Sequence, residues 1–191
     1  MTTNLLLIDD SIASVDIFVN GLNSNTKHVL YNVADTFETL NEKIQLLNET
    51  TFDYVGFVFD DSGPYKMFVS YNTFMSFDQT VMTTNNTTSF IKNLVQAYSV
   101  KTLDFLACNL LSYTEWKNYF SFLIAENQGL AVRASEDETG NLAVGGDWIL
   151  ETTNEESEDL DASMHAIRLS TEIKSSLRSS SVGLEATANK I

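Results

Sequence analysis

Four side chains that could take part in chemistry follow apolar stretches of this chain. Asp9 and Asp10 come directly after one such stretch, Asp60 after a second and Cys108 after a third. Carboxylate oxygens suit a hard cation such as Mg²⁺. A cysteine at a turn suits nucleophilic catalysis when an imidazole lies near enough to take its proton. The sequence therefore offers two candidate chemistries, one acidic and one based on a thiol.

Each candidate has a simpler structural interpretation. Asp9, Asp10 and Asp60 are weak candidates for a metal site, in a pattern that resembles the phosphoryl-accepting receiver domains of two-component systems. Receivers carry a lysine after the fifth strand, whereas Arg133 and acidic residues follow here. We therefore favour carboxylates that cap turns and helices at strand ends. For Cys108 the simpler interpretation is a buried, inert thiol.

The elements that must position these residues alternate between strand and helix patterns. Short apolar runs predict strands, and apolar residues at helical spacing predict amphipathic helices. The strands are expected at residues 5–8, 28–33, 54–59, 102–107 and 130–132, and the helices at 12–22, 37–47, 90–98 and 116–124.

Local signals refine this outline. Asp35 is expected to cap the second helix and Ser112 the fourth, in a capping box with Glu115. Aromatic and apolar residues within 66–78 predict an inserted β-hairpin. The outline is typical of an α/β three-layer sandwich with a mostly parallel sheet, in which sites lie at the carboxyl ends of the strands.

Composition excludes several classes of function. The 191 residues include 11 basic and 26 acidic side chains, so the net charge is 11 − 26 = −15. Such an acidic chain is unsuited to binding nucleic acid or an anionic membrane. One cysteine and two histidines exclude disulfide frameworks and multi-cysteine zinc sites, and nothing indicates a cofactor.

The two ends of the sequence predict the cellular location of the protein and the boundary of its domain. The first apolar run stops after four residues and has no basic residue before it, so we expect no signal peptide and an intracellular protein. No stretch is long enough for membrane insertion. Residues 1–152 are expected to form one domain, followed at 153–191 by an acidic linker and a Ser-rich tail.

Four segments in order resemble one known family, the caspase-like domain of unknown function found in very large bacterial surface and adhesin-type proteins. They are an opening strand at residues 6–11, an apolar strand that ends in Ser-His-Gly in the family, the run Ala107-Cys108-Asn109, and a closing segment at 134–151 that contains Gly145-Gly146-Asp147-Trp148. The resemblance covers roughly residues 4–152. It implies a caspase/hemoglobinase-like fold with a Cys-His dyad whose nucleophile would be Cys108.

The sequence departs from that family where the histidine belongs. Asp60 or, with a two-residue shift, Ser62 stands at the histidine position, and a nearby carboxylate disfavours a thiolate. His28 falls inside a predicted strand and His165 in the tail. We therefore expect no catalytic residues and no enzyme activity, but a pseudoenzyme. The alternatives are a cysteine peptidase that uses Cys108 with an atypical base, and a receiver-like phosphoryl acceptor.

The expected role is a structural or protein-interaction component of a larger assembly, such as a virion or another large particle. Other proteins are the expected partners, through the C-terminal tail and the insert at 66–78. The Asn/Thr-rich composition with one proline is typical of AT-rich genomes, including those of large DNA viruses.

Overall fold

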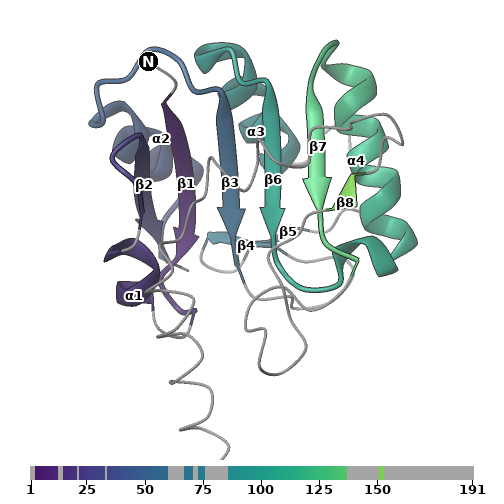
Figure 1. Cartoon of the computed structure of the whole chain (residues 1–191), viewed down its shortest axis with the longest axis horizontal. Helices are drawn as coiled ribbons and strands as arrows, with labels where there is room; N and C mark the ends of the chain where they lie inside the picture. Colours follow the sequence, from purple (N-terminus) through teal and green to yellow (C-terminus); the bar gives the residue numbers. More distant parts are fainter. Residues whose placement is uncertain are drawn as a thin grey trace, which may run out of the picture.

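A single twisted sheet organises the computed structural model (Figure 1), which describes residues 3–12, 15–20, 22–32, 34–59, 67–70, 73–75, 86–136 and 151–152. The strand order is β2-β1-β3-β6-β7-β8. The strands are β1 (Asn4–Asp9), β2 (Thr26–Tyr31), β3 (Tyr54–Val58), β6 (Thr102–Leu106), β7 (Ala131–Ala134) and β8 (Glu151–Thr152). The first five are parallel, and β8 pairs antiparallel with β7. The expected α/β sandwich with a mostly parallel sheet is therefore confirmed.

The helices divide unequally between the two faces of the sheet. They are α1 (Val15–Asn20), α2 (Phe37–Gln45), α3 (Asn86–Tyr98) and α4 (Thr114–Glu126), with a short 3-10 helix, η1 (Leu110–Ser112). The chain steps one way from β1 to β2 and the other way from β2 through β3 and β6 to β7, so right-handed crossovers place α1 opposite the other three helices. Figure 1 shows this arrangement.

Successive side chains of β1 pack into hydrophobic clusters on opposite faces of the sheet. Leu5 and Leu7 are fully buried in the core that β1 shares with α2, α3 and α4. Leu6 and Ile8 belong to a smaller cluster against which residues flanking and within α1 pack. The near-continuous apolar run at the start of the chain thus reflects a strand that is buried on both sides.

Gly56 allows the sheet to pack closely on the α1 side. A Cβ atom at this position would lie 2.5 Å from Leu6 Cδ2 and 3.2 Å from Leu106 Cδ1. Only a residue without a side chain lets these two leucines meet across β3.

The register brings the expected functional positions to one edge of the sheet. Ile8 lies opposite Val58, and Val58 lies opposite Leu106. The residues that follow these three therefore leave the sheet at the same level. The strand order reverses between β1 and β3, which is where α/β folds form ligand sites.

Two expected helix caps are wrong. Thr36, not Asp35, is the N-cap of α2, and it forms a reciprocal capping box with Thr39. Helix α4 begins at Thr114 without a side-chain cap, because Ser112 instead donates its hydroxyl to the Asn109 carbonyl. Asp35 instead accepts hydrogen bonds from the Asn32 amide and the Lys43 ammonium group.

The inserted hairpin is confirmed, as β4 (Met67–Ser70) pairs antiparallel with β5 (Thr73–Met75) in a separate two-stranded sheet. The tail at 153–191 and residues 137–150 of the closing segment at 134–151 lie outside the described residues. None of the described helices has the length and apolar character that a membrane crossing requires.

Candidate functional site

Asp9 closes β1 and holds the turn that follows. Its Oδ1 atom accepts hydrogen bonds from the Ser11 amide at 2.9 Å and the Ser11 hydroxyl at 2.6 Å. Asp9 is buried, whereas the neighbouring Asp10 is exposed. The carboxylate thus serves as the cap of a turn, as carboxylates at strand ends often do.

Tyr31 lies beside Asp9, because the two residues are register partners at the ends of β2 and β1. Burial raises the pKa of the Tyr31 phenol well above its usual value, and the negative charge of Asp9 raises it further. The phenol therefore stays neutral at physiological pH. It cannot act there as a base or nucleophile.

Cys108 occupies a sharp strand-to-helix turn. It is partly exposed and follows the buried Ala107. Asn109 adopts the left-handed conformation, with φ 56° and ψ 20°, and its carbonyl accepts hydrogen bonds from the amide and hydroxyl of Ser112. Asparagine is one of few residues that tolerate this conformation. The turn gives Cys108 a defined position two residues beyond the end of β6.

His28 lies far from this turn across the sheet. It sits in the middle of β2, opposite Leu6, and β1 and β3 separate β2 from β6. Three interstrand spacings amount to about 14 Å. The expectation that His28 cannot serve Cys108 as a base is therefore supported by its position in the sheet.

The remaining positions expected from the family resemblance, Asp60, Ser62 and His165, lie outside the described residues. The strand order still places Asp9, the last residue of β1, and Cys108, two residues beyond β6, at the same edge of the sheet, with β3 between the two strands. Two interstrand spacings correspond to about 10 Å.

The part of the chain that the structure describes contains no group of three or more His, Cys, Asp or Glu side chains suited to a metal ion. Of the expected metal candidates, Asp9 and Asp10 fall in this part. Asp9 directs one oxygen to Ser11.

A buried ion pair in the middle of the sheet was not anticipated from the sequence. Arg133 donates from Nε and Nη2 to the two carboxylate oxygens of Asp104, at 2.8 and 2.9 Å. The guanidinium carbon also lies 5.3 Å from the centre of the Tyr54 ring. Burial raises the pKa of Asp104, although the Arg133 charge opposes the change.

A signal for this pair exists in the sequence. Asp104 interrupts the apolar run of β6, and Arg133 interrupts that of β7. A charge inside a strand that is buried on both faces needs a partner. Their direct register, Asp104 opposite Arg133, could be recognised only once the two strands were known to be neighbours.

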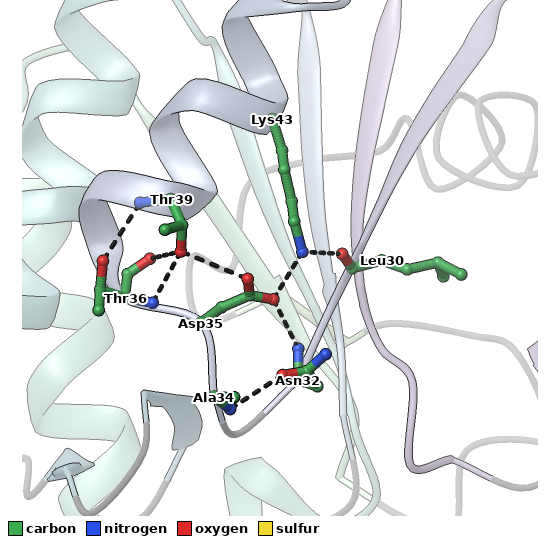
Figure 2. Close-up of polar contacts among 7 residues, drawn as sticks. All are labelled: Leu30, Asn32, Ala34, Asp35, Thr36, Thr39 and Lys43. Atoms are coloured by element: carbon green, nitrogen blue, oxygen red, sulfur yellow. Dashed lines mark hydrogen bonds and ion pairs between the residues drawn. The ribbon is translucent and has the colours of Figure 1, made fainter.

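A second polar network anchors α2 to the sheet (Figure 2). Lys43 donates to the Asp35 carboxylate at 2.7 Å and to the Leu30 carbonyl at 3.0 Å, and the Asn32 amide donates to the same carboxylate. Burial of Asp35 raises its pKa, but the hydrogen bonds from Lys43 and Asn32 outweigh this effect and lower it. This network holds the connection between β2 and α2 in place. It does not provide a side chain that could take part in a reaction.

A family model described as "Domain of unknown function (DUF4347)" matches residues 5–171. No curated protein and no solved structure matches the chain.

Proposed function

The chain belongs to the DUF4347 family, and we propose that it acts there as a catalytically silent, caspase-like domain with a structural or protein-interaction role. The family model covers most of the chain, and its description records no activity. The proposal rests on the residues around the strand end that carries Cys108.

The observation that supports it best is the separation between Cys108 and His28, the histidine that lies in the described part of the chain. A cysteine nucleophile needs a base within about 3 Å, or one water molecule away. His28 lies on β2, with β1 and β3 between it and the strand that leads to Cys108. Asp60 and Ser62, at the position where the resemblance expects histidine, cannot replace an imidazole as the base that activates a thiol at neutral pH.

A cysteine peptidase with an atypical base is the alternative that one observation favours. Cys108 is partly exposed at a turn held by Asn109 and Ser112, which is a suitable position for a nucleophile. A receiver-like phosphoryl acceptor has less support, since Asp9 already accepts two hydrogen bonds from Ser11.

The proposed partners are other proteins, bound through the hairpin insert at 66–78 and the C-terminal tail. Within this proposal the protein is intracellular and is incorporated into a large particle such as a virion. The strongly acidic composition makes a nucleic-acid partner unsuitable.

The test is the pH dependence of iodoacetamide labelling at Cys108, the single cysteine of the chain. An unactivated thiol ionises near pH ~8.5, so the labelling rate should rise about tenfold per pH unit from pH 6 to 8. Mass spectrometry of the intact protein measures the rate, and Cys108→Ser reports labelling at other sites.

His28→Gln is the matched variant for the base. We expect it to leave the pH profile of Cys108 unchanged. A rate that has already levelled off by pH 7 in the unsubstituted protein, or a profile that shifts in His28→Gln, would favour the peptidase, because activated thiols ionise at about pH 3.5–7.5.

A further inference from the structure

Strand β2 forms one edge of the described sheet and has a neighbouring strand, β1, on one side (Figure 1). An edge strand presents a row of backbone N–H and C=O groups that can pair with a strand of another molecule. β2 has six residues, which is an ordinary length for a strand that pairs. What occupies its outer edge therefore decides whether the sheet can be extended there.

The hydrogen bonds between β2 and β1 identify the groups of β2 that point outward. The carbonyls of Asn25 and Tyr31 accept hydrogen bonds from the amides of Asn4 and Asp10, both at 2.9 Å. The backbone groups of successive residues in a strand point to opposite sides, so odd-numbered residues of β2 face β1 and even-numbered residues face away from it. The outward groups thus belong to Thr26, His28 and Leu30, and to Asn32 just beyond the strand.

An ion pair occupies the end of this outward row. Lys43 donates to the Leu30 carbonyl at 3.0 Å, and the Asp35 carboxylate accepts a hydrogen bond from the Asn32 amide at 2.9 Å (Figure 2). Lys43 and Asp35 are joined to each other at 2.7 Å. A residue of a further parallel strand would bind these same two groups, with its N–H on the Leu30 carbonyl and its C=O on the Asn32 amide. The two side chains therefore take the place of that residue's backbone.

The open part of the edge is short, because the beginning of the row is occupied too. The Thr26 amide donates to the Asn23 carbonyl at 3.1 Å, in the turn that leads into β2. Between the two ends, the N–H and C=O of His28 and the N–H of Leu30 have no hydrogen-bond partner among the described residues. The Leu30 side chain beside them is 37% exposed. The outer edge is thus open at its centre and occupied at both ends.

We propose that the Lys43–Asp35 pair blocks strand addition at β2, and that a second copy of this chain pairs with β2 when the pair is removed. In an antiparallel arrangement centred on His28, the N–H of each His28 meets the C=O of the other. This arrangement is two-fold symmetric and self-complementary, so a second copy fits the open centre of the edge. It would also cover the exposed Leu30 of each copy.

The ion pair opposes this arrangement because of its position and charge. A strand that arrives over Leu30 meets the Lys43 ammonium group on the carbonyl that it would approach. It would also have to remove water from the ammonium and carboxylate groups, which is costly. Lysine on an edge strand is a common means of preventing such pairing, and here a helix supplies it.

This inference goes beyond the function proposed above and does not depend on it. It implies that native partners do not extend the sheet at β2. The hairpin insert and the tail therefore remain the proposed contacts for partners.

Sedimentation velocity over a series of chain concentrations tests the proposal by measuring the self-association constant of the full chain. Asp35→Asn with Lys43→Met, the unblocked variant, removes one charge of each sign and so keeps the net charge at −15. We expect it to raise the association constant about tenfold, as roughly half a hydrogen bond at each of the two symmetry-related edges would give. Lys43→Arg keeps a charged donor and should leave the constant unchanged.

Two controls locate the effect. Lys92→Met with Glu126→Gln removes an exposed ion pair between α3 and α4 with the same change of charges, and should leave the association constant unchanged. His28→Pro, added to the unblocked variant, removes the N–H at the centre of the open edge. Proline is tolerated there because this N–H points away from β1. The addition should return the constant to that of the unsubstituted protein.

Circular dichroism verifies that each variant is folded. If the unblocked variant is not, Lys43→Met alone takes its place, because it keeps the hydrogen bond between Asp35 and Asn32. An unblocked variant that associates no more strongly than the unsubstituted protein, or no more strongly than the control at Lys92 and Glu126, would overturn the proposal. A gain that survives His28→Pro would also overturn it, because association would then use another surface. None of these results bears on the labelling of Cys108, so the two proposals fail separately.

Discussion

Asp104 and Arg133 form a buried ion pair between neighbouring strands of the described sheet. Both charges have left water, and each carboxylate oxygen has one guanidinium donor. The attraction between buried charges roughly offsets the cost of removing them from water. The pair therefore adds little net stability to the fold. Removing either member, however, leaves the other as an unpaired buried charge, which destabilises the fold.

We predict that Arg133→Met lowers the free energy of unfolding by about 3–5 kcal/mol, because it leaves a buried carboxylate unpaired. Asp104→Leu with Arg133→Met should recover most of that loss. Urea unfolding at pH 7 measures both. Lys92→Met, which breaks the exposed ion pair with Glu126, is the control and should cost less than about 1 kcal/mol. A double variant as unstable as Arg133→Met would contradict this account.

At the scale of elements, α2 shows how a short helix is held in place. Its capping box occupies the first turn, and Lys43 reaches from the last turn to the end of β2. Because a nine-residue helix is marginal by itself, these contacts and the burial of Leu40 and Ile44 decide whether it forms.

This network predicts a pH dependence. The pKa of Asp35 is lower in the folded protein than in the unfolded chain, so its ionised form stabilises the fold. That contribution is fully present above the unfolded pKa of about 3.9 and is lost as the pH falls through the lower, folded pKa. Asp35→Asn should therefore cost about 1–2 kcal/mol at pH 7, a range that allows for the partial exposure of Lys43.

The measurement is urea unfolding of the unsubstituted protein and Asp35→Asn at pH 7 and pH 3. The difference between the two proteins should shrink at pH 3. Asp10→Asn, at an exposed position, controls for the loss of one negative charge. Equal differences at both pH values would mean that the Asp35 charge contributes nothing and that the loss comes from replacing a hydrogen-bond acceptor by an amide NH₂ group.

At the scale of the whole molecule, the net negative charge destabilises the compact folded state. With a net charge of −15, the folded chain repels itself. The exposed ion pairs of Lys27, Lys92 and Lys101 with nearby carboxylates are each worth little. Repulsion should therefore outweigh attraction among the surface charges.

We predict that raising NaCl from 20 to 500 mM at pH 7 increases the melting temperature by roughly 3 °C, which corresponds to about 1 kcal/mol. The added salt screens the repulsion between carboxylates. KCl should give the same increase, because the effect depends on ionic strength. A melting temperature that falls with salt would show that the surface ion pairs dominate instead.

Much of the fold could be predicted from the sequence because its signals are local. Strands buried on both faces read as apolar runs, as at residues 5–8, and amphipathic helices repeat their apolar residues every three or four positions, as in α2. The hairpin at 66–78 and the turn after Cys108 were visible for the same reason. Local pattern also placed Asp9 and Cys108 at strand ends.

Tertiary structure alone decided what depends on neighbours that are distant in the chain. Asp104 and Arg133 are 29 positions apart, and only the pairing of β6 with β7 turns two isolated interior charges into one ion pair. Strand order likewise separates His28 from the strand that leads to Cys108, which composition could not show. The predicted caps of α2 and α4 were wrong because Asp35 and Ser112 form other hydrogen bonds, and only the folded geometry selects among the possible partners.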